Sequence, residues 1–149
     1  KKEPFFRALR CDKLILTGMQ ETVLEYLRCG FGTHPDLPLV VMLSATVEGH
    51  LRPRGEAILS QFANHKSFDA SLIDSVARCG GGTMPKSEIP SLAIDLKHRN
   101  FSVTKMAQLL RVRSLPVMGY IADDSYRIDL RTVFPEQDGI LVENILAIA

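Results

Sequence analysis

The chain has 149 residues, of which 46% are hydrophobic and 23% are charged, and its formal net charge is +1. This length is sufficient for a domain with its own hydrophobic core, and the balanced charge excludes a disordered acidic or basic tail and a general polyanion-binding surface. The apolar runs are short, and the one at 37–43 contains Pro38, so the sequence predicts no membrane-spanning helix. The first residues lack the apolar core of a signal peptide, and we expect no cleavable signal.

Cysteine and histidine spacing argues against a disulfide framework and a metal centre. The three cysteines are odd in number, widely spaced and without a CxxC pair (Cys11, Cys29 and Cys79). The four histidines show neither an HxH nor an HxxxH spacing (His34, His50, His65 and His98). We therefore expect free thiols in a reducing, cytoplasmic environment, histidines exposed to solvent, and no metal.

The first half of the chain is predicted to be helical. Asp12 is a good N-cap, and Gly30 is suited to close the helix that follows it. Its apolar residues recur at three- and four-residue spacings (Leu14, Leu16, Met19, Val23, Leu24 and Leu27). A short apolar helix is predicted at about 39–44, and Thr46 is predicted to cap another at about 47–65. Pro53 lies inside that last range, so the helix either begins later or kinks there.

The second half changes to strand-like patterns. Strands are predicted at 70–79 and, opened by Pro90, at 90–96, with a short helix capped by Ser102 after them. Strands at 117–122 and 126–130 form a predicted hairpin through 123–125, and Pro135 suits the first turn of a final helix. Helices followed by short antiparallel strands predict an α+β fold, a small antiparallel sheet with helices packed on one face.

The glycine run at 80–82 could be mistaken for a phosphate-binding loop. However, no Gly-Lys-Ser/Thr follows it, and Pro85 and Pro90 prevent the helix whose N-terminus would hold the phosphate. The run is better explained as a connection between two strands, where glycine permits close backbone approach.

Two sets of arginines are the remaining candidates for function. Arg7 and Arg10 are three residues apart on one side of a helical turn, in a basic N-terminal segment, and could grip an oxyanion through forked hydrogen bonds. Arg131 ends a predicted strand, where it could meet a substrate at the rim of the sheet. A structural ion pair of Arg131 with Asp129 or Glu136 explains its position equally well.

Three stretches resemble one family. The run Arg7-Ala-Leu-Arg-Cys-Asp-Lys-Leu14, the segment Gly80-Gly-Gly-Thr-Met-Pro85 with Ile89-Pro-Ser91, and Ile128-Asp-Leu-Arg-Thr132 are similar to segments of bacterial selenocysteine synthases. These are pyridoxal-phosphate (PLP) enzymes of fold type I, in which a lysine binds the cofactor shortly before a Lys-Lys pair. Lys1 and Lys2 match that pair, so the resemblance places the cofactor lysine outside this chain. Lys13 matches a different Asp-Lys of the family and is not expected to bind PLP.

The resemblance implies a division of the chain and a parent reaction. Residues 1–30 would be a connecting segment and long helix that follow a large PLP-binding domain, and residues 31–149 would be the C-terminal small domain. The parent enzyme would convert seryl-tRNA(Sec) to selenocysteinyl-tRNA(Sec) with selenophosphate in the cytoplasm, as a homo-oligomer such as a ring of dimers. This chain alone would be inactive.

The resemblance also implies roles for individual residues. Arg7 and Arg10 would bind the selenophosphate anion, and Arg131, Gly81 and Thr83 would lie at the rim of the active site, with no catalytic residue in the chain. Two alternatives remain open at this point. One is a related PLP-dependent lyase acting on a small phosphorylated amino acid or amino sugar acid, and the other is a stand-alone α+β interaction module without catalysis.

Overall fold

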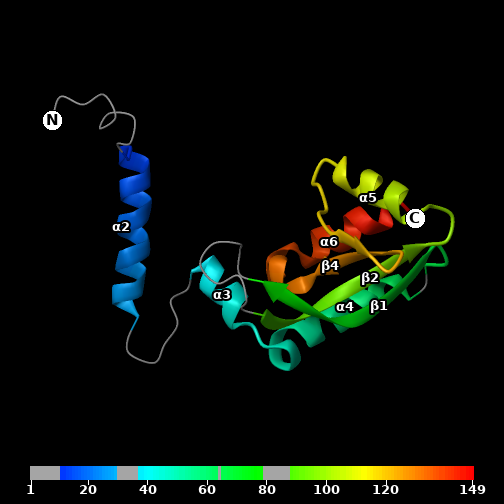
Figure 1. The fold of residues 1–149 in the computed structure, drawn as a ribbon, viewed down its shortest axis with the longest axis horizontal. Helices are drawn as coiled ribbons and strands as arrows, with labels where there is room; N and C mark the ends of the chain where they lie inside the picture. The colour runs from blue at the N-terminus through cyan, green and yellow to red at the C-terminus, as the bar shows by residue number, and fades with distance from the viewer. Residues whose placement is uncertain (1–10, 30–36, 64, 79–87) are drawn as a thin grey trace. The chain divides into compact units, whose positions relative to one another are not determined.

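The computed structural model describes residues 11–29, 37–63, 65–78 and 88–149, and the chain divides into two compact units, residues 1–41 and 42–149 (Figure 1). The first unit contains α2 (Lys13–Arg28) and the beginning of α3 (Pro38–Ser44), which ends in the second unit. Both helices were predicted. Asp12 caps α2, because its Oδ1 accepts a hydrogen bond from the backbone N–H of Ile15 at 3.0 Å. Gly30, the predicted C-terminal glycine, lies outside the described residues.

The predicted helix at 47–65 is interrupted, as Pro53 suggested. Thr46 caps a π-helical turn, η1 (Val47–Leu51), by accepting a hydrogen bond from the N–H of Gly49, and α4 (Arg52–Phe62) then begins. Pro53 lies in the first turn of α4, where the missing backbone donor would have no helical partner in any case. The single helix expected from the apolar spacing is therefore two segments with different hydrogen-bonding patterns.

Four antiparallel strands form a sheet in the order β1-β2-β4-β3. Their bounds are β1 (Phe68–Arg78), β2 (Glu88–His98), β3 (Tyr120–Ala122) and β4 (Ser125–Asp129). Pro90 was expected to open β2 but lies inside it, opposite Val76 of β1. A proline is tolerated there because β4 pairs only with residues 93–96, so at Pro90 the strand has a partner on one side only.

The β3–β4 hairpin turns at Asp123 and Asp124, whose φ angles are 50° and 55°. This left-handed pair is the backbone of a two-residue turn that matches the twist of the strands, and aspartate tolerates it better than most residues. The two adjacent carboxylates thus form a turn, as predicted. The first strand of the hairpin is shorter than expected: it begins at Tyr120, and residues 117–119 precede it as irregular chain.

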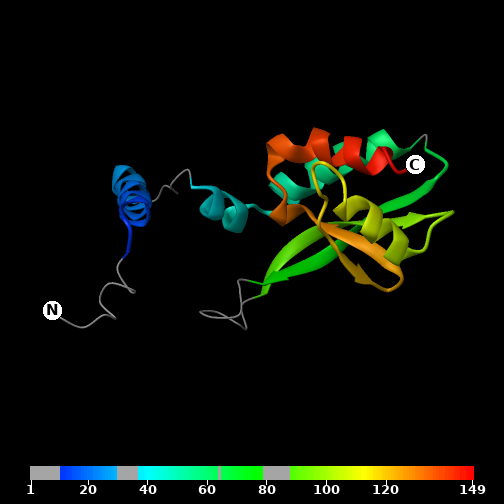
Figure 2. The ribbon, with the colours of Figure 1, turned by 90° about the horizontal axis from the view of Figure 1, so that it is seen from above.

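The core lies on one face of the sheet, under α4, α5 (Val103–Arg111) and α6 (Asp138–Leu146) (Figure 2). Alternate residues of β2 enter it, and Leu92, Ile94 and Leu96 are at most 1% exposed. The helices contribute further fully or nearly fully buried side chains (Ile58, Met106, Leu110 and Ile145). This arrangement confirms the predicted α+β fold with helices on one face.

The other face of the sheet carries polar residues near one end. Ser75 pairs with Ser91 across β1 and β2, and Asp129 of β4 lies opposite Ala93, so these side chains share the face away from the helices. Within the described ranges, no helix has the length and apolar character needed to cross a membrane.

Candidate functional site

Four of the five residues proposed for the site, Arg7, Arg10, Gly81 and Thr83, lie outside the described residues. Their roles stay predictions. Arg131 is described, and the segment around it therefore defines the part of the candidate site whose geometry is known.

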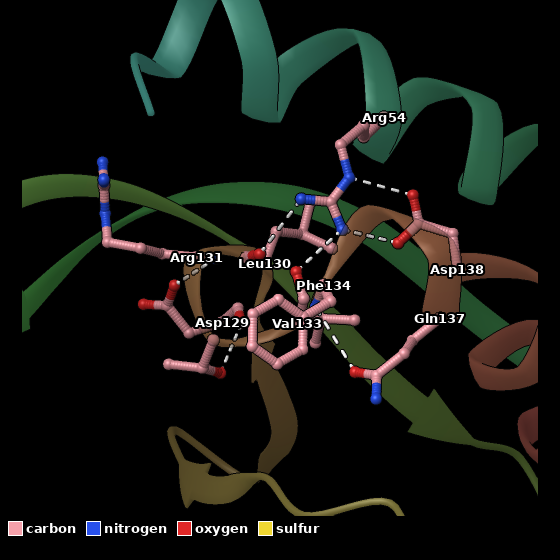
Figure 3. Close-up of polar contacts among 9 residues, drawn as sticks. Arg54, Asp129, Leu130, Arg131, Val133, Phe134, Gln137 and Asp138 are labelled. Carbon is pink, nitrogen blue, oxygen red and sulfur yellow. Dashed lines mark hydrogen bonds and ion pairs between the residues drawn. The ribbon is translucent and has the colours of Figure 1, made fainter. Parts of the chain in front are cut away.

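The segment after β4 is organised by Asp129. This residue caps the short 3-10 helix η2 (Leu130–Thr132): its Oδ1 accepts a hydrogen bond from the N–H of Arg131 at 2.9 Å, and its carbonyl accepts one from the Thr132 hydroxyl at 2.8 Å (Figure 3). The sequence Asp-Leu-Arg-Thr therefore turns away from the strand direction immediately after the sheet ends.

The Asp129 carboxylate also connects three strands. Ser91 of β2 donates to Oδ1 at 2.6 Å, and Ser75 of β1 donates to Oδ2 at 3.0 Å. Hydroxyl and amide donors to a carboxylate form strong, charge-assisted hydrogen bonds, particularly where water is partly excluded. Asp129 thus fixes the relative positions of β1, β2 and the turn that carries Arg131.

Arg131 is 5% exposed, and its guanidinium donates to backbone carbonyls. Nη1 donates to Met42 at 2.7 Å and to Leu43 at 3.2 Å, and Nη2 donates to Pro90. Met42 and Leu43 belong to the last turn of α3, where helix carbonyls lack partners of their own and the helix dipole favours a cation. Arg131 therefore binds the C-terminal end of α3 to the start of β2.

The alternative ion pair of Arg131 is not formed in the described part of the chain, where neither Asp129 nor Glu136 contacts the guanidinium. The remaining donor, Nε, is buried and has no hydrogen-bond partner among the described residues. The geometry of this arginine is thus that of a group holding backbone segments together, with its two terminal nitrogens already occupied.

A second arginine, Arg54 of α4, was not predicted as important. It forms a bidentate ion pair with Asp138 at the start of α6, at 2.9 and 2.6 Å, and also donates to the carbonyls of Val133 at 3.0 Å and Leu130 at 3.4 Å (Figure 3). Both side chains of the pair are largely buried.

Asp138 lies in the first turn of α6, where a carboxylate is favoured by the helix dipole. Arg54 and Asp129 therefore hold the same segment, residues 129–133, from two directions. The pair spans 84 positions, so no local sequence signal could have identified it.

A third polar cluster lies on the β4 hairpin. Arg127 donates to Asp95 of β2 at 2.8 Å and to Asp123 of the turn at 2.7 Å. The hydrogen bond to Asp95, and after it the one to Asp123, raises the pKa of Arg127 above its usual value. The arginine is therefore cationic at every accessible pH. It fixes the hairpin against the centre of the sheet.

The histidine prediction was wrong for His98, which is 8% exposed at the end of β2. Its ring stacks on Phe101, with centroids 4.3 Å apart, and meets the edge of Phe68. Nδ1 accepts hydrogen bonds from the N–H groups of Asn100 and Phe101, so the proton of the neutral ring resides on Nε2. His98 therefore belongs to the core and stabilises the turn that follows β2. The spacing of the histidines argued only against a metal site and carried no information about burial.

The described lysines and metal-ligating side chains are dispersed over the surface and the fold. All four described lysines are exposed (Lys13, Lys66, Lys97 and Lys105). Within the described ranges no group of three or more histidine, cysteine, aspartate or glutamate side chains could hold a metal ion.

An open pocket of about 430 Å³ between the 115–118 segment and α6 is lined by apolar and neutral polar residues, and no titratable group lines it.

The comparisons with known proteins agree on one family. The family model for L-seryl-tRNA selenium transferase matches residues 1–134. A relative named L-seryl-tRNA(Sec) selenium transferase from Aquifex aeolicus is 32% identical over 136 residues, which are 91% of this chain and 29% of the relative. Another of that name from Aliarcobacter butzleri is 31% identical over 98% of this chain and 30% of its own length, and one from Desulfovibrio desulfuricans is 32% identical over 91% and 29%.

The fold is a small α+β domain, and the hydrogen bonds of Arg54, Asp129 and Arg131 connect its own elements. The chain belongs to the L-seryl-tRNA selenium transferase family, because the family model covers nine-tenths of it. It spans about three-tenths of the length of the curated relatives that it matches.

Proposed function

We propose that this chain is the C-terminal part of a PLP-dependent selenium transferase that converts seryl-tRNA(Sec) to selenocysteinyl-tRNA(Sec) with selenophosphate. The observation that carries the proposal is the family match over residues 1–134, which includes the Arg7–Leu14 run as well as all four strands of the sheet. The relatives carry that enzyme name, and their sequences extend far beyond the region matched here.

In this proposal the cofactor is bound by a lysine outside this chain. PLP would supply the electron sink for replacing the seryl oxygen by selenium, and the protein would supply orientation and charge. The other partners in the proposal are the tRNA, the large PLP-binding domain and further copies of the chain in a homo-oligomer, in the cytoplasm.

Arg7 and Arg10 are proposed to bind the selenophosphate anion. Selenophosphate offers several acceptor oxygens, and two guanidinium groups three residues apart in the sequence could both donate to it. A lysine would retain the charge but not the paired donors of the planar fork. Gly81 and Thr83 are proposed to lie at the rim of the same site.

For Arg131 we propose an indirect role at that rim. Its guanidinium contacts the carbonyls of Met42, Leu43 and Pro90, so it would act as a positioning residue that holds backbone around the site rather than as a substrate ligand. Asp129 would support it from the sheet side through its bonds to Ser75 and Ser91.

The test is steady-state kinetics of the full-length enzyme with selenophosphate varied. Arg10→Ala should weaken the use of the donor by about tenfold to a hundredfold, because each charge-assisted hydrogen bond contributes about 1.5–3 kcal/mol. Arg10→Lys should recover only part of the loss. Arg99→Ala is the matched control, since Arg99 is an exposed arginine with no side-chain hydrogen bond among the described contacts, and it should leave the kinetics unchanged. An unchanged donor dependence in both Arg7→Ala and Arg10→Ala would refute the anion-binding role.

A further inference from the structure

Helix α2 has an exposed apolar side. None of its 16 residues is buried, and Leu16, Met19 and Leu27 are 55%, 66% and 74% exposed. Scattered exposed apolar side chains are ordinary, but a contiguous group of this kind marks an interaction surface.

Six of the seven exposed large apolar residues of α2 form a stripe along the helix, and the seventh, Leu14 in the first turn, lies on the other side. Leu16, Met19, Val23 and Tyr26 follow one another at spacings of three, four and three residues, and Ile15 and Leu27 flank them. Residues at these spacings lie above one another on one side of a helix. We call these six residues the α2 stripe. The pattern is that of a seam which interlocks with a neighbouring helix or with a groove of similar width.

Apart from Leu14, the opposite side of α2 is polar. Glu25 and Arg28 form an ion pair at 3.5 Å, and Thr17 and Glu21 are exposed there. The helix therefore has one side suited to water and one suited to a protein surface. An isolated helix of this length is marginal in water, so a protein surface that covers the α2 stripe would also stabilise the helix itself.

A pairing of two copies through α2 alone would be too small for a stable dimer. A 16-residue helix is about 24 Å long and about 10 Å wide, so one side offers on the order of 240 Å², against about 800 Å² per partner in a standard interface. The same small surface is sufficient when it is joined to its partner in one polypeptide, because the effective concentration is then high. More than two-thirds of each of the relatives described above has no counterpart in this chain, and α2 lies within the family match.

We propose that the α2 stripe is the docking surface for the region of the family's longer polypeptide that this chain does not span. The partner surface is apolar and shaped to receive one helix side, and it covers Leu16, Met19, Val23 and Tyr26 while leaving Glu21 and Arg28 in water. This proposal rests on the family assignment and not on the identity of the selenium donor.

The test is hydrogen exchange of the α2 amides in two proteins, the 149-residue chain and the full-length parent. We expect exchange about a hundredfold slower in the full-length protein, because local opening of a docked helix is rare. Val23→Asp in the full-length protein should abolish most of this protection. Thr17→Asp introduces the same carboxylate on the polar side, and it should preserve the protection.

Three results would overturn the proposal. The first is equal protection of α2 in the monomeric 149-residue chain, which would show that residues 42–149 cover the stripe. The second is protection of the short chain that rises with its concentration, which would assign the stripe to a second copy. The third is an unprotected α2 in the full-length protein. None of these depends on donor kinetics, so a failure of the docking surface is distinguishable from a failure of the proposed reaction.

Discussion

Helices α2 and α5 have similar local signals and opposite environments. Both begin at a capping side chain, Asp12 and Ser102, and both carry apolar residues at helical spacing. Yet α5 buries Met106, Ala107 and Leu110 against the sheet, whereas α2 buries nothing. An amphipathic pattern thus establishes that a helix needs a partner surface and on which side. It does not establish which surface that is.

The same contrast separates the polar residues of the two regions. In residues 42–149, Arg54, Asp129 and Arg131 have buried or half-buried partners distant in sequence, whereas the described contacts of the α2 side chains are to residues three or four positions away. Substitutions should therefore have large effects in the sheet domain and small effects in α2. Of the four predictions that test these contacts, the first two compare the two regions directly and the last two compare sites within residues 42–149.

The largest effect is expected for Arg131→Ala. The variant lacks the buried guanidinium, which donates to the carbonyls of Met42, Leu43 and Pro90. Because these carbonyls lose their donor, the free energy of unfolding should fall by about 3 kcal/mol. Arg131→Lys should restore part of this loss. Urea denaturation followed by circular dichroism measures the change. Arg28→Ala on α2 is the control and should change it by less than about 0.5 kcal/mol. Equal effects of the two alanine variants would contradict the contrast.

Alanine substitutions at Gly119 and Gly18 compare how closely neighbouring atoms approach the backbone in the two regions. A Cβ at Gly119 would collide with the carbonyl of Arg127 and the ring of Tyr126, so Gly119→Ala should destabilise the protein by about 1–3 kcal/mol. A Cβ at Gly18 meets nothing within 4 Å, and Gly18→Ala should instead stabilise α2 by about 1 kcal/mol through helix propensity. Thermal unfolding and helix content by circular dichroism distinguish the two. A stabilised Gly119→Ala variant would refute the close approach.

The Arg54–Asp138 pair should show measurable coupling. A double-mutant cycle of unfolding free energies with Arg54→Ala and Asp138→Asn should give a coupling free energy of about 1–2 kcal/mol. The reason is that both side chains are about four-fifths buried and the contact is bidentate. The exposed pair Arg78–Glu88, with a single contact at 3.0 Å, is the matched control and should give less than about 0.5 kcal/mol. Coupling of the same size in both cycles would show that burial does not matter here.

The smallest effect concerns Tyr126 and pH. Burial raises the pKa of Tyr126, so the folded state retains a proton that the unfolded state loses above pH 10. This contribution to stability is complete below pH 10 and should decline as the pH rises further. Tyr126→Phe removes that decline and also loses the hydrogen bond to the carbonyl of Val117, at a cost of about 1 kcal/mol at neutral pH. An identical alkaline slope in both proteins would assign the pH dependence to other groups.

Local features were predicted well from the sequence. The caps at Asp12 and Ser102 and the turn at Asp123 and Asp124 follow from side chains that hydrogen-bond or bend their own backbone. The position of Pro90 inside β2 was missed, because it depends on where β4 stops pairing. The burial of His98 was missed for a similar reason, since it depends on the packing of Phe68 and Phe101.

The candidate site was predictable only as a resemblance. The segment Asp129–Thr132 was identified from its similarity to a family, but its contacts with Ser75, Ser91 and the end of α3 come from three other stretches of chain. Hydrogen-bond partners at such separations leave no periodic trace in a sequence.

The sequence by itself determined the α+β class, most of the elements and the family, because hydrophobic periodicity, caps and short motifs are local properties. Only the tertiary structure decided that Arg131 binds backbone carbonyls, that Arg54 joins α4 to α6, and that Pro53 divides a helix after a π-turn. Those outcomes arise from burial, since a polar group removed from water must find its partner wherever the folded chain places one.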